Sequence, residues 1–217
     1  MNINHAVDEK VEGDLLKAIF DRQKSLMGKY HGIELKSGLL QTEDCPVNLD
    51  DKRGQARIKD FSWRVTEELG EALDARSSKE HYQEELIDGL HFLTELTILA
   101  GKDYDSILPQ DILVHDDDHL RDLVENARVN VFEYGGELDF WVSRFIEQLA
   151  MMCNCLKNKP WKQSMMKTDR EAFYNRLAEA WVCYITILVV SGMRAEDIAN
   201  VYLKKSQVNQ FRQRSNY

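Results

Sequence analysis

Two acidic clusters are the residues most able to do chemistry in this sequence. The first contains Glu67, Glu68 and Glu71, and the second contains Glu85 and Asp88. Residues three and four apart share one face of an α-helix, so each cluster should project carboxylates from one side of its helix. Two antiparallel neighbouring helices could therefore bring four carboxylates to one point inside a bundle.

Four carboxylates at one point would repel one another and raise one another's pKa values unless a cation lies between them. A hard divalent cation such as Mg²⁺ binds carboxylate oxygens and removes that repulsion. Both clusters are interleaved with apolar residues such as Leu69 and Leu86, and an unpaired charge beside a core is costly. The pattern predicts a magnesium site for triphosphate chemistry; a solvated acidic helix face is the alternative.

The C-terminal segment is the second informative region. Lys205, Asn209 and Arg212 recur there at helical spacing. A cation, an amide and a guanidinium in this order suit a phosphate, a base or ribose edge, and a second phosphate. For this segment alone, an ordinary basic helix end favoured by the helix dipole is the competing interpretation.

Length and composition limit the class of protein. The chain has 217 residues with only 11 glycines and 3 prolines, which suits a single all-α domain over residues 1–217 with short connections. A net charge of −9 argues against a long nucleic acid as partner. We find no signal-peptide pattern, no apolar run near the roughly 20 residues of a bilayer span, and no Cys-x-x-Cys pair. We therefore expect a cytoplasmic protein with no membrane partner.

Hydrophobic periodicity predicts a helical bundle with the carboxylate site at its centre, formed by four helices. The predicted helices span residues 15–30, 61–75, 81–100, 119–131, 138–156, 171–191 and 195–211. Residues 32–59 contain Gly38, Pro46 and Gly54, which indicate an irregular connector. Residues 102–119 form a second connector, whose acidic run at 116–118 suggests a helix cap or a solvated loop.

The acidic helix pair has a possible internal copy. Residues 64–71 align with 144–151, and residues 86–101 align with 177–192. In the second copy Glu68, Glu71 and Glu85 become Gln148, Met151 and Arg176. A duplication would mean that the first pair kept the chemistry, and it predicts that the two pairs superpose; chance similarity between amphipathic helices is the alternative.

Together these segments resemble the all-α nucleoside triphosphate pyrophosphatases, and the dimeric dUTPase branch in particular. The family motifs Glu-Glu-x-x-Glu and Glu-x-x-Asp match residues 67–71 and 85–88, and the second motif continues as Asp-x-x-His-Phe through His91 and Phe92. The remaining matches are Ser-Trp-Arg at 62–64, Tyr-x-x-Lys-x-x-x-Asn-x-x-Arg-Gln at 202–213, a base-reading glutamine at Gln23, and a segment of phage-type relatives at 156–161. The chain departs from several relatives at Leu26, where they carry a polar group, and lacks a glycine-rich tail.

The resemblance implies hydrolysis of dUTP to dUMP and pyrophosphate by a homodimer that uses two or more Mg²⁺ ions per site, for which Mn²⁺ can substitute. It implies metal ligands at Glu68, Glu71, Glu85 and Asp88. Glu67 would be the general base or would orient the ligands, and Glu68 and Glu71 would also be catalytic.

The resemblance also implies a set of substrate contacts. Lys205 and Arg212 would bind phosphates, and Gln23 and Asn209 would read the pyrimidine edge. Phe92 and Trp63 would stack on or wall the base and sugar, and His91 would contact the ligand. For the two aromatic residues, core packing is the alternative, and for His91 it is a hydrogen-bonded core histidine.

Three other functions compete with this one. A relative with another base preference, such as a combined dCTP/dUTP pyrophosphatase, would carry the same metal motifs. A ferritin-like di-iron bundle also uses inward carboxylates, but it requires Glu-x-x-His pairs from two helices. A non-catalytic helical interaction module would leave the carboxylates as surface decoration.

Overall fold

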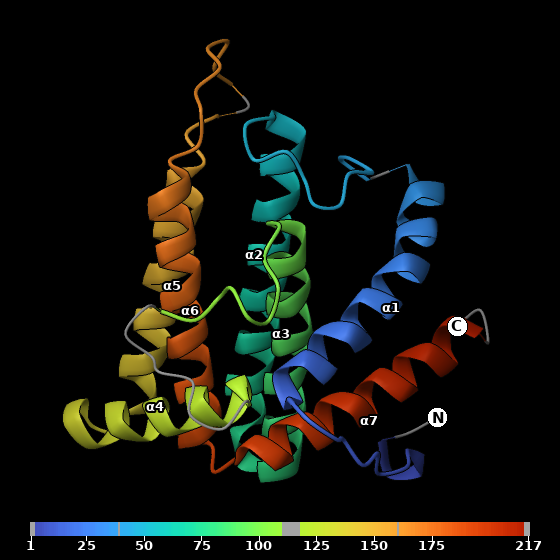
Figure 1. Ribbon diagram of the computed structural model, residues 1–217, viewed down its shortest axis with the longest axis vertical. Helices are drawn as coiled ribbons and strands as arrows, with labels where there is room; N and C mark the ends of the chain where they lie inside the picture. The colour runs from blue at the N-terminus through green and yellow to red at the C-terminus, as the bar shows by residue number, and fades with distance from the viewer. Residues whose placement is uncertain (1–2, 39, 110–117, 160, 215–217) are drawn as a thin grey trace.

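The computed structural model describes residues 3–38, 40–109, 118–159 and 161–214, and Figure 1 shows their arrangement. The elements in chain order are η1 (Ile3–His5), α1 (Leu15–Ser37), α2 (Lys52–Asp74), η2 (Ala75–Ser77), α3 (Lys79–Leu99), α4 (His119–Tyr134), α5 (Leu138–Cys155), α6 (Arg170–Val190) and α7 (Ala195–Arg214). The described ranges contain no strand. The all-α prediction is confirmed.

Two antiparallel helix pairs, α2–α3 and α5–α6, pack side by side (Figure 1). Helices α1 and α7 pack against each other and against α3, and α4 packs against α6 at one end. Polar contacts join the two pairs, since the Trp181 indole donates to Thr97 Oγ1 at 2.9 Å and the Tyr184 hydroxyl donates to the Leu86 carbonyl at 2.7 Å. Helix α3 therefore lies between α6 on one side and α1 with α7 on the other.

One hydrophobic cluster runs through the molecule and takes buried side chains from all seven α-helices. Helix α6 supplies Phe173, Trp181 and Tyr184, all fully buried. Among the described residues, α6 is the one helix long and apolar enough to cross a membrane by length and composition. Its apolar side chains pack into this cluster, against α4 and α5.

The connector predicted at 32–59 is helical at both of its ends, so this prediction was wrong there. Helix α1 continues to Ser37 and ends at Gly38, which has the left-handed φ of 71° common at helix C-termini. Helix α2 begins at Lys52, and the carboxylate of the preceding Asp51 accepts hydrogen bonds from backbone N–H groups in the first turn.

Gly54 explains part of that error. It lies in the first turn of α2, where a Cβ atom would be only 2.2 Å from the carbonyl oxygen of Asn48. The glycine thus permits a loop to pass close to the helix and does not interrupt it.

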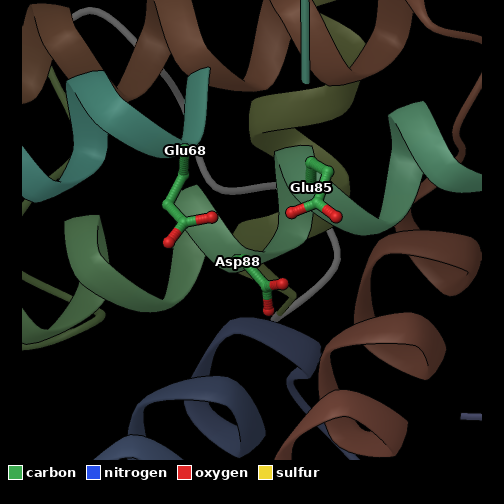
Figure 2. Close-up of side chains that lie close together, drawn as sticks. All are labelled: Glu68, Glu85 and Asp88. Atoms are coloured by element: carbon green, nitrogen blue, oxygen red, sulfur yellow. The ribbon is translucent and has the colours of Figure 1, made fainter. Parts of the chain in front are cut away.

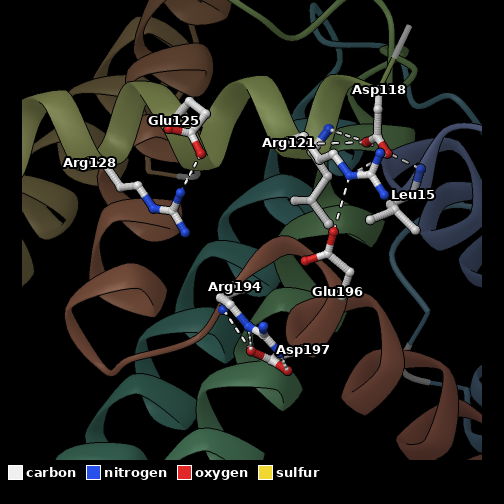
Figure 3. Close-up of polar contacts among 9 residues, drawn as sticks. Leu15, Asp118, Arg121, Glu125, Arg128, Arg194, Glu196 and Asp197 are labelled. Atoms are coloured by element: carbon white, nitrogen blue, oxygen red, sulfur yellow. Dashed lines mark hydrogen bonds and ion pairs between the residues drawn. The ribbon is translucent and has the colours of Figure 1, made fainter. Parts of the chain in front are cut away.

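Asp118 begins α4 and ties it to α1 (Figure 3). Its carboxylate caps the first turn of α4 and accepts a further hydrogen bond from the Leu15 backbone N–H at 3.4 Å. Arg121 then links α4 to α7 by donating to Glu196 at 3.2 Å. The helix-cap interpretation is confirmed for Asp118; residues 116 and 117 lie outside the described ranges.

Candidate active site

Three carboxylates from two helices converge beside α1 and α7 (Figure 2). Glu68 comes from α2, and Glu85 and Asp88 come from successive turns of α3. One oxygen of each lies within 4.8 Å of the other two. The cluster lies on the α1–α7 side of the α2–α3 pair, whereas α5 and α6 cover the opposite side.

Gly89 allows α2 and α3 to approach closely at this level. A Cβ atom on Gly89 would lie 3.4 Å from Glu68 Cβ and only 2.1 Å from the Tyr184 hydroxyl. Glycine is therefore the residue that lets Tyr184 reach the Leu86 carbonyl while Glu68 faces α3.

Burial raises the pKa values of two carboxyls in the cluster, and neighbouring carboxylates add to the rise. Burial raises the pKa of Glu68 to about 7, and the charges of Asp88, Glu71 and Glu85 add to the rise. Burial also raises the pKa of Asp88 to about 6, although the Lys205 ammonium, 2.5 Å from Asp88 Oδ2, opposes the rise. Protons therefore compete with cations for Glu68 near neutral pH and for Asp88 in mildly acidic solution.

The donor set fits a hard divalent cation. It consists of carboxylate oxygens, partly buried and close enough to share one ion, which is what Mg²⁺ prefers in proteins. The 2.5 Å contact with the Lys205 ammonium shows that the site already attracts positive charge. Glu67 and Glu71 lie on the exposed side of α2 and outside the group within 4.8 Å, so their roles stay predictions.

A cavity of about 280 Å³ adjoins the carboxylates, and we call it the substrate pocket. It is lined by Gln23, Leu26, Tyr30, Glu34, Arg64, Glu68, Asp88, His91, Phe92, Glu95, Asn209 and Arg212. A larger cavity of about 440 Å³ lies between α4, α5 and α6. Since the only carboxylate group of metal-binding geometry in the described residues borders the smaller cavity, that one is the candidate active site.

A buried hydrogen-bond network forms one end of the substrate pocket. The Gln23 amide donates from Nε2 to Glu95 at 2.8 Å and accepts at Oε1 from the Tyr202 hydroxyl at 2.7 Å. His91 Nδ1 lies 3.1 Å from the same Gln23 oxygen, and the centres of the His91 and Tyr202 rings lie 3.7 Å apart. Burial lowers the pKa of His91 to about 3, so the ring is neutral.

A family model described as dUTPase matches residues 72–217. The chain belongs to the all-α dUTPase family. Its activity is that of a dUTP diphosphatase, which hydrolyses dUTP to dUMP and pyrophosphate. No curated protein and no solved structure matches the chain.

The match covers the second acidic cluster and the C-terminal helix of this dUTPase, whereas the first acidic cluster precedes it. The structure places Glu68 of that first cluster beside Glu85 and Asp88 of the matched region. The family confirms the predicted hydrolase, so the interaction-module interpretation is wrong. The dUTPase match removes the di-iron alternative. In the structure His91 bonds to Gln23, and His81 Nε2 lies 2.8 Å from Glu85 Oε1.

Most of the predicted substrate contacts of the dUTPase lie together. The residues that line the substrate pocket are Gln23, His91, Phe92, Asn209 and Arg212. Lys205 lies beside the pocket and pairs with Asp88. Trp63 is 62% exposed and does not line the pocket, so its role stays a prediction.

Sequence reasoning missed several residues of the pocket. Glu95 follows His91 by one helical turn on α3, and this spacing is the one signal that could have indicated it. Arg64 was noted only as part of a motif; its guanidinium pairs with Glu34 at 3.1 Å and lies 5.8 Å from the centre of the Phe92 ring.

The second helix pair repeats one detail of the site. Gln148 and Arg176 align with Glu68 and Glu85, and Arg176 donates to Gln148 at 2.8 Å. Aligned positions therefore face each other in both pairs, although only the first pair presents two carboxylates. This contact supports the duplication, while superposition of the pairs stays a prediction.

Proposed function

We propose that this dUTPase is Mg²⁺-dependent and that Glu68, Glu85 and Asp88 hold the metal. The main support is that one carboxylate oxygen of each residue lies within 4.8 Å of the other two. The carboxylates stand at the edge of a pocket lined by polar and aromatic side chains. Glu71 would join them as a fourth ligand from the next turn of α2, because its charge already acts on Glu68. The site would take two or more Mg²⁺ ions, or Mn²⁺.

Bound Mg²⁺ would neutralise charge on the triphosphate and lower the pKa of a bound water. Glu67 would accept a proton from that water or orient the ligands. The Lys205 ammonium and the Arg212 guanidinium would bind phosphate oxygens, and Lys205 would leave Asp88 to do so. Catalysis of this kind depends on positioning the substrate and stabilising its charge, and side chains from α2, α3 and α7 would do both.

The deoxyuridine would occupy the substrate pocket. Phe92 is half-buried there and would pack against the base. Gln23 and Asn209 would contact the pyrimidine edge, and His91 would close the end of the pocket. Trp63, which is exposed, would approach the substrate only from the rim.

We further propose a homodimer in the cytoplasm, each chain a single domain over residues 1–217. The single hydrophobic cluster shared by all seven α-helices supports one domain. Exposed apolar side chains such as Phe132, which is 90% exposed, would suit a subunit interface. Unpaired thiols such as exposed Cys45 suit a reducing compartment.

The test is product analysis with dUTP, dCTP, dTTP, dATP and dGTP, with and without Mg²⁺. We expect dUMP and pyrophosphate from dUTP only with Mg²⁺ or Mn²⁺, and no pyrophosphate with Asp88→Asn. Glu179→Gln, an exposed change on α6, is the matched control and should retain full activity. Full activity in chelator, or in Asp88→Asn, would contradict the proposed site.

A further inference from the structure

A directional chain of hydrogen bonds runs from Glu95 through Gln23 to His91 at one end of the substrate pocket. Glu95 is buried, with 6% of its surface exposed, and lies on α3 two turns after Asp88. Its carboxylate accepts from Gln23 Nε2 at 2.8 Å. Burial raises the pKa of Glu95 to about 7, so above neutral pH the group is ionised and has no hydrogen to donate. In that state the contact is possible only with the amide nitrogen of Gln23 facing Glu95.

The orientation of Gln23 then dictates the contacts of its oxygen. That oxygen faces the Tyr202 hydroxyl at 2.7 Å and His91 Nδ1 at 3.1 Å. An amide oxygen only accepts, so both neighbours must donate to it, and its two lone pairs are then used. The reversed amide would direct its oxygen at the Glu95 carboxylate, which is repulsive.

This chain fixes the tautomer of His91. Because the ring is neutral and Nδ1 carries the hydrogen, Nε2 has a free lone pair. Nε2 is buried and has no hydrogen-bond partner among the residues that the structure describes, while His91 itself lines the substrate pocket. A buried acceptor without a partner costs free energy unless a ligand donates to it.

Gln23 and His91 both line the substrate pocket. In this arrangement the unused donor of the pair is the second hydrogen on Gln23 Nε2, and the unused acceptor is His91 Nε2. Uracil carries the complementary pair, a carbonyl oxygen at position 4 beside an N–H at position 3. Cytosine carries the opposite pair, an amino group beside a bare ring nitrogen.

We propose that Glu95 is a positioning residue that sets the direction of this chain and thereby makes the pocket select uracil over cytosine. The inference rests on the proposed function, which places the base in the substrate pocket. Glu95 would not contact the base itself; it would act through Gln23 and His91.

The first test measures base selection. At pH 8, above the pKa of Glu95, Glu95→Gln replaces a group that only accepts by one that donates or accepts, so both directions of the chain become possible. We expect the ratio of kcat/KM for dUTP to kcat/KM for dCTP to fall at least tenfold in this variant, with Glu179→Gln as the matched control that keeps the ratio. A ratio within twofold of the wild type would overturn the inference.

The same assay separates this inference from the proposed function. If the wild type hydrolyses dUTP with Mg²⁺ and the variant keeps its ratio, the inference fails and the function stands. If the wild type shows no Mg²⁺-dependent pyrophosphate release from dUTP, the proposed function fails.

The second test needs no variant at position 95 and covers the case in which Glu95→Gln does not fold. Nitrogen-15 NMR at pH 8 distinguishes the two neutral imidazole tautomers, and His91→Gln assigns the signal among the six histidines. We expect the Nδ1–H tautomer for His91 in the wild type and, if Glu95→Gln folds, a mixture in that variant. The Nε2–H tautomer in the wild type would overturn the inference.

Discussion

Gly89→Ala is predicted to destabilise the protein through one specific contact. The new Cβ atom would lie 2.1 Å from the Tyr184 hydroxyl, far inside van der Waals contact. Tyr184 is fully buried and packs against Phe145 at 4.9 Å between ring centres, so it has little room to move. The hydroxyl would have to give up its 2.7 Å hydrogen bond to the Leu86 carbonyl.

The magnitude follows from three terms. Overpacking of a close-packed core costs about 1–3 kcal/mol. A buried hydroxyl that loses its partner costs about 1–3 kcal/mol. Alanine is favoured over glycine inside a helix by about 1 kcal/mol, which acts in the opposite direction. We therefore expect Gly89→Ala to lower the free energy of unfolding by about 3 kcal/mol.

Tyr184→Phe provides the decisive second variant. Without the hydroxyl, the nearest ring atom would be Cζ of residue 184 at 3.2 Å, which a shift of a few tenths of an ångström relieves. We expect Tyr184→Phe alone to cost about 1 kcal/mol for the lost hydrogen bond. In that background, Gly89→Ala should cost less than about 1 kcal/mol.

Urea unfolding of the four proteins measures this double-mutant cycle. Gly70→Ala is the matched control, because a Cβ atom on this exposed helical glycine would meet nothing within 4 Å. It should raise the free energy of unfolding by up to about 1 kcal/mol. Equal costs of Gly89→Ala in the wild type and in the Tyr184→Phe background would refute the reasoning.

Three further predictions concern charge. Mg²⁺ should raise the melting temperature more at pH 8 than at pH 5.5 in differential scanning fluorimetry, because protons compete for Glu68 and Asp88, whose pKa values are about 7 and about 6; an equal rise at both pH values would contradict this. Lys205→Met should raise the pKa of Asp88, since Lys205 lowers it, and shift the acidic limb of the pH–rate profile to higher pH, whereas an unmoved limb would argue against the pairing. Glu95→Gln should stabilise the protein at pH 8 but not at pH 4. Burial raises the pKa of Glu95 from 4.5 to about 7, so its ionisation at pH 8 lowers the free energy of unfolding by up to about 3 kcal/mol. Chemical unfolding at both pH values measures this, and a variant less stable than the wild type at pH 8 would refute it.

The sequence predicted the helices well because their apolar residues recur at helical spacing and their ends carry caps. It failed at the ends of residues 32–59, where glycine was taken as a helix breaker. Gly54 is required by the close approach of Asn48, a tertiary contact that no local pattern reveals. Gly89 is required in the same way by Tyr184, which is distant in sequence.

The candidate site was predicted in part for a similar reason. Helical spacing shows which residues share a side of a helix, and Glu85 with Asp88 followed this rule. It does not show which side faces the neighbouring helix, and Glu71 proved to be exposed although it is one turn from Glu68. The Glu95 network joins residues from three helices, so its hydrogen bonds are visible only in the folded chain.

Electron paramagnetic resonance can count the Mn²⁺ ions bound in titrations of the protein without nucleotide, and so shows whether Glu68, Glu85 and Asp88 form a metal site. The wild type should bind at least one Mn²⁺ per chain, and Mg²⁺ should displace it. Asp88→Asn should weaken binding at least tenfold, while the control Glu179→Gln should bind like the wild type. No Mn²⁺ bound by the wild type, or equal binding by Asp88→Asn, would contradict the assignment of Glu68, Glu85 and Asp88 as the metal site.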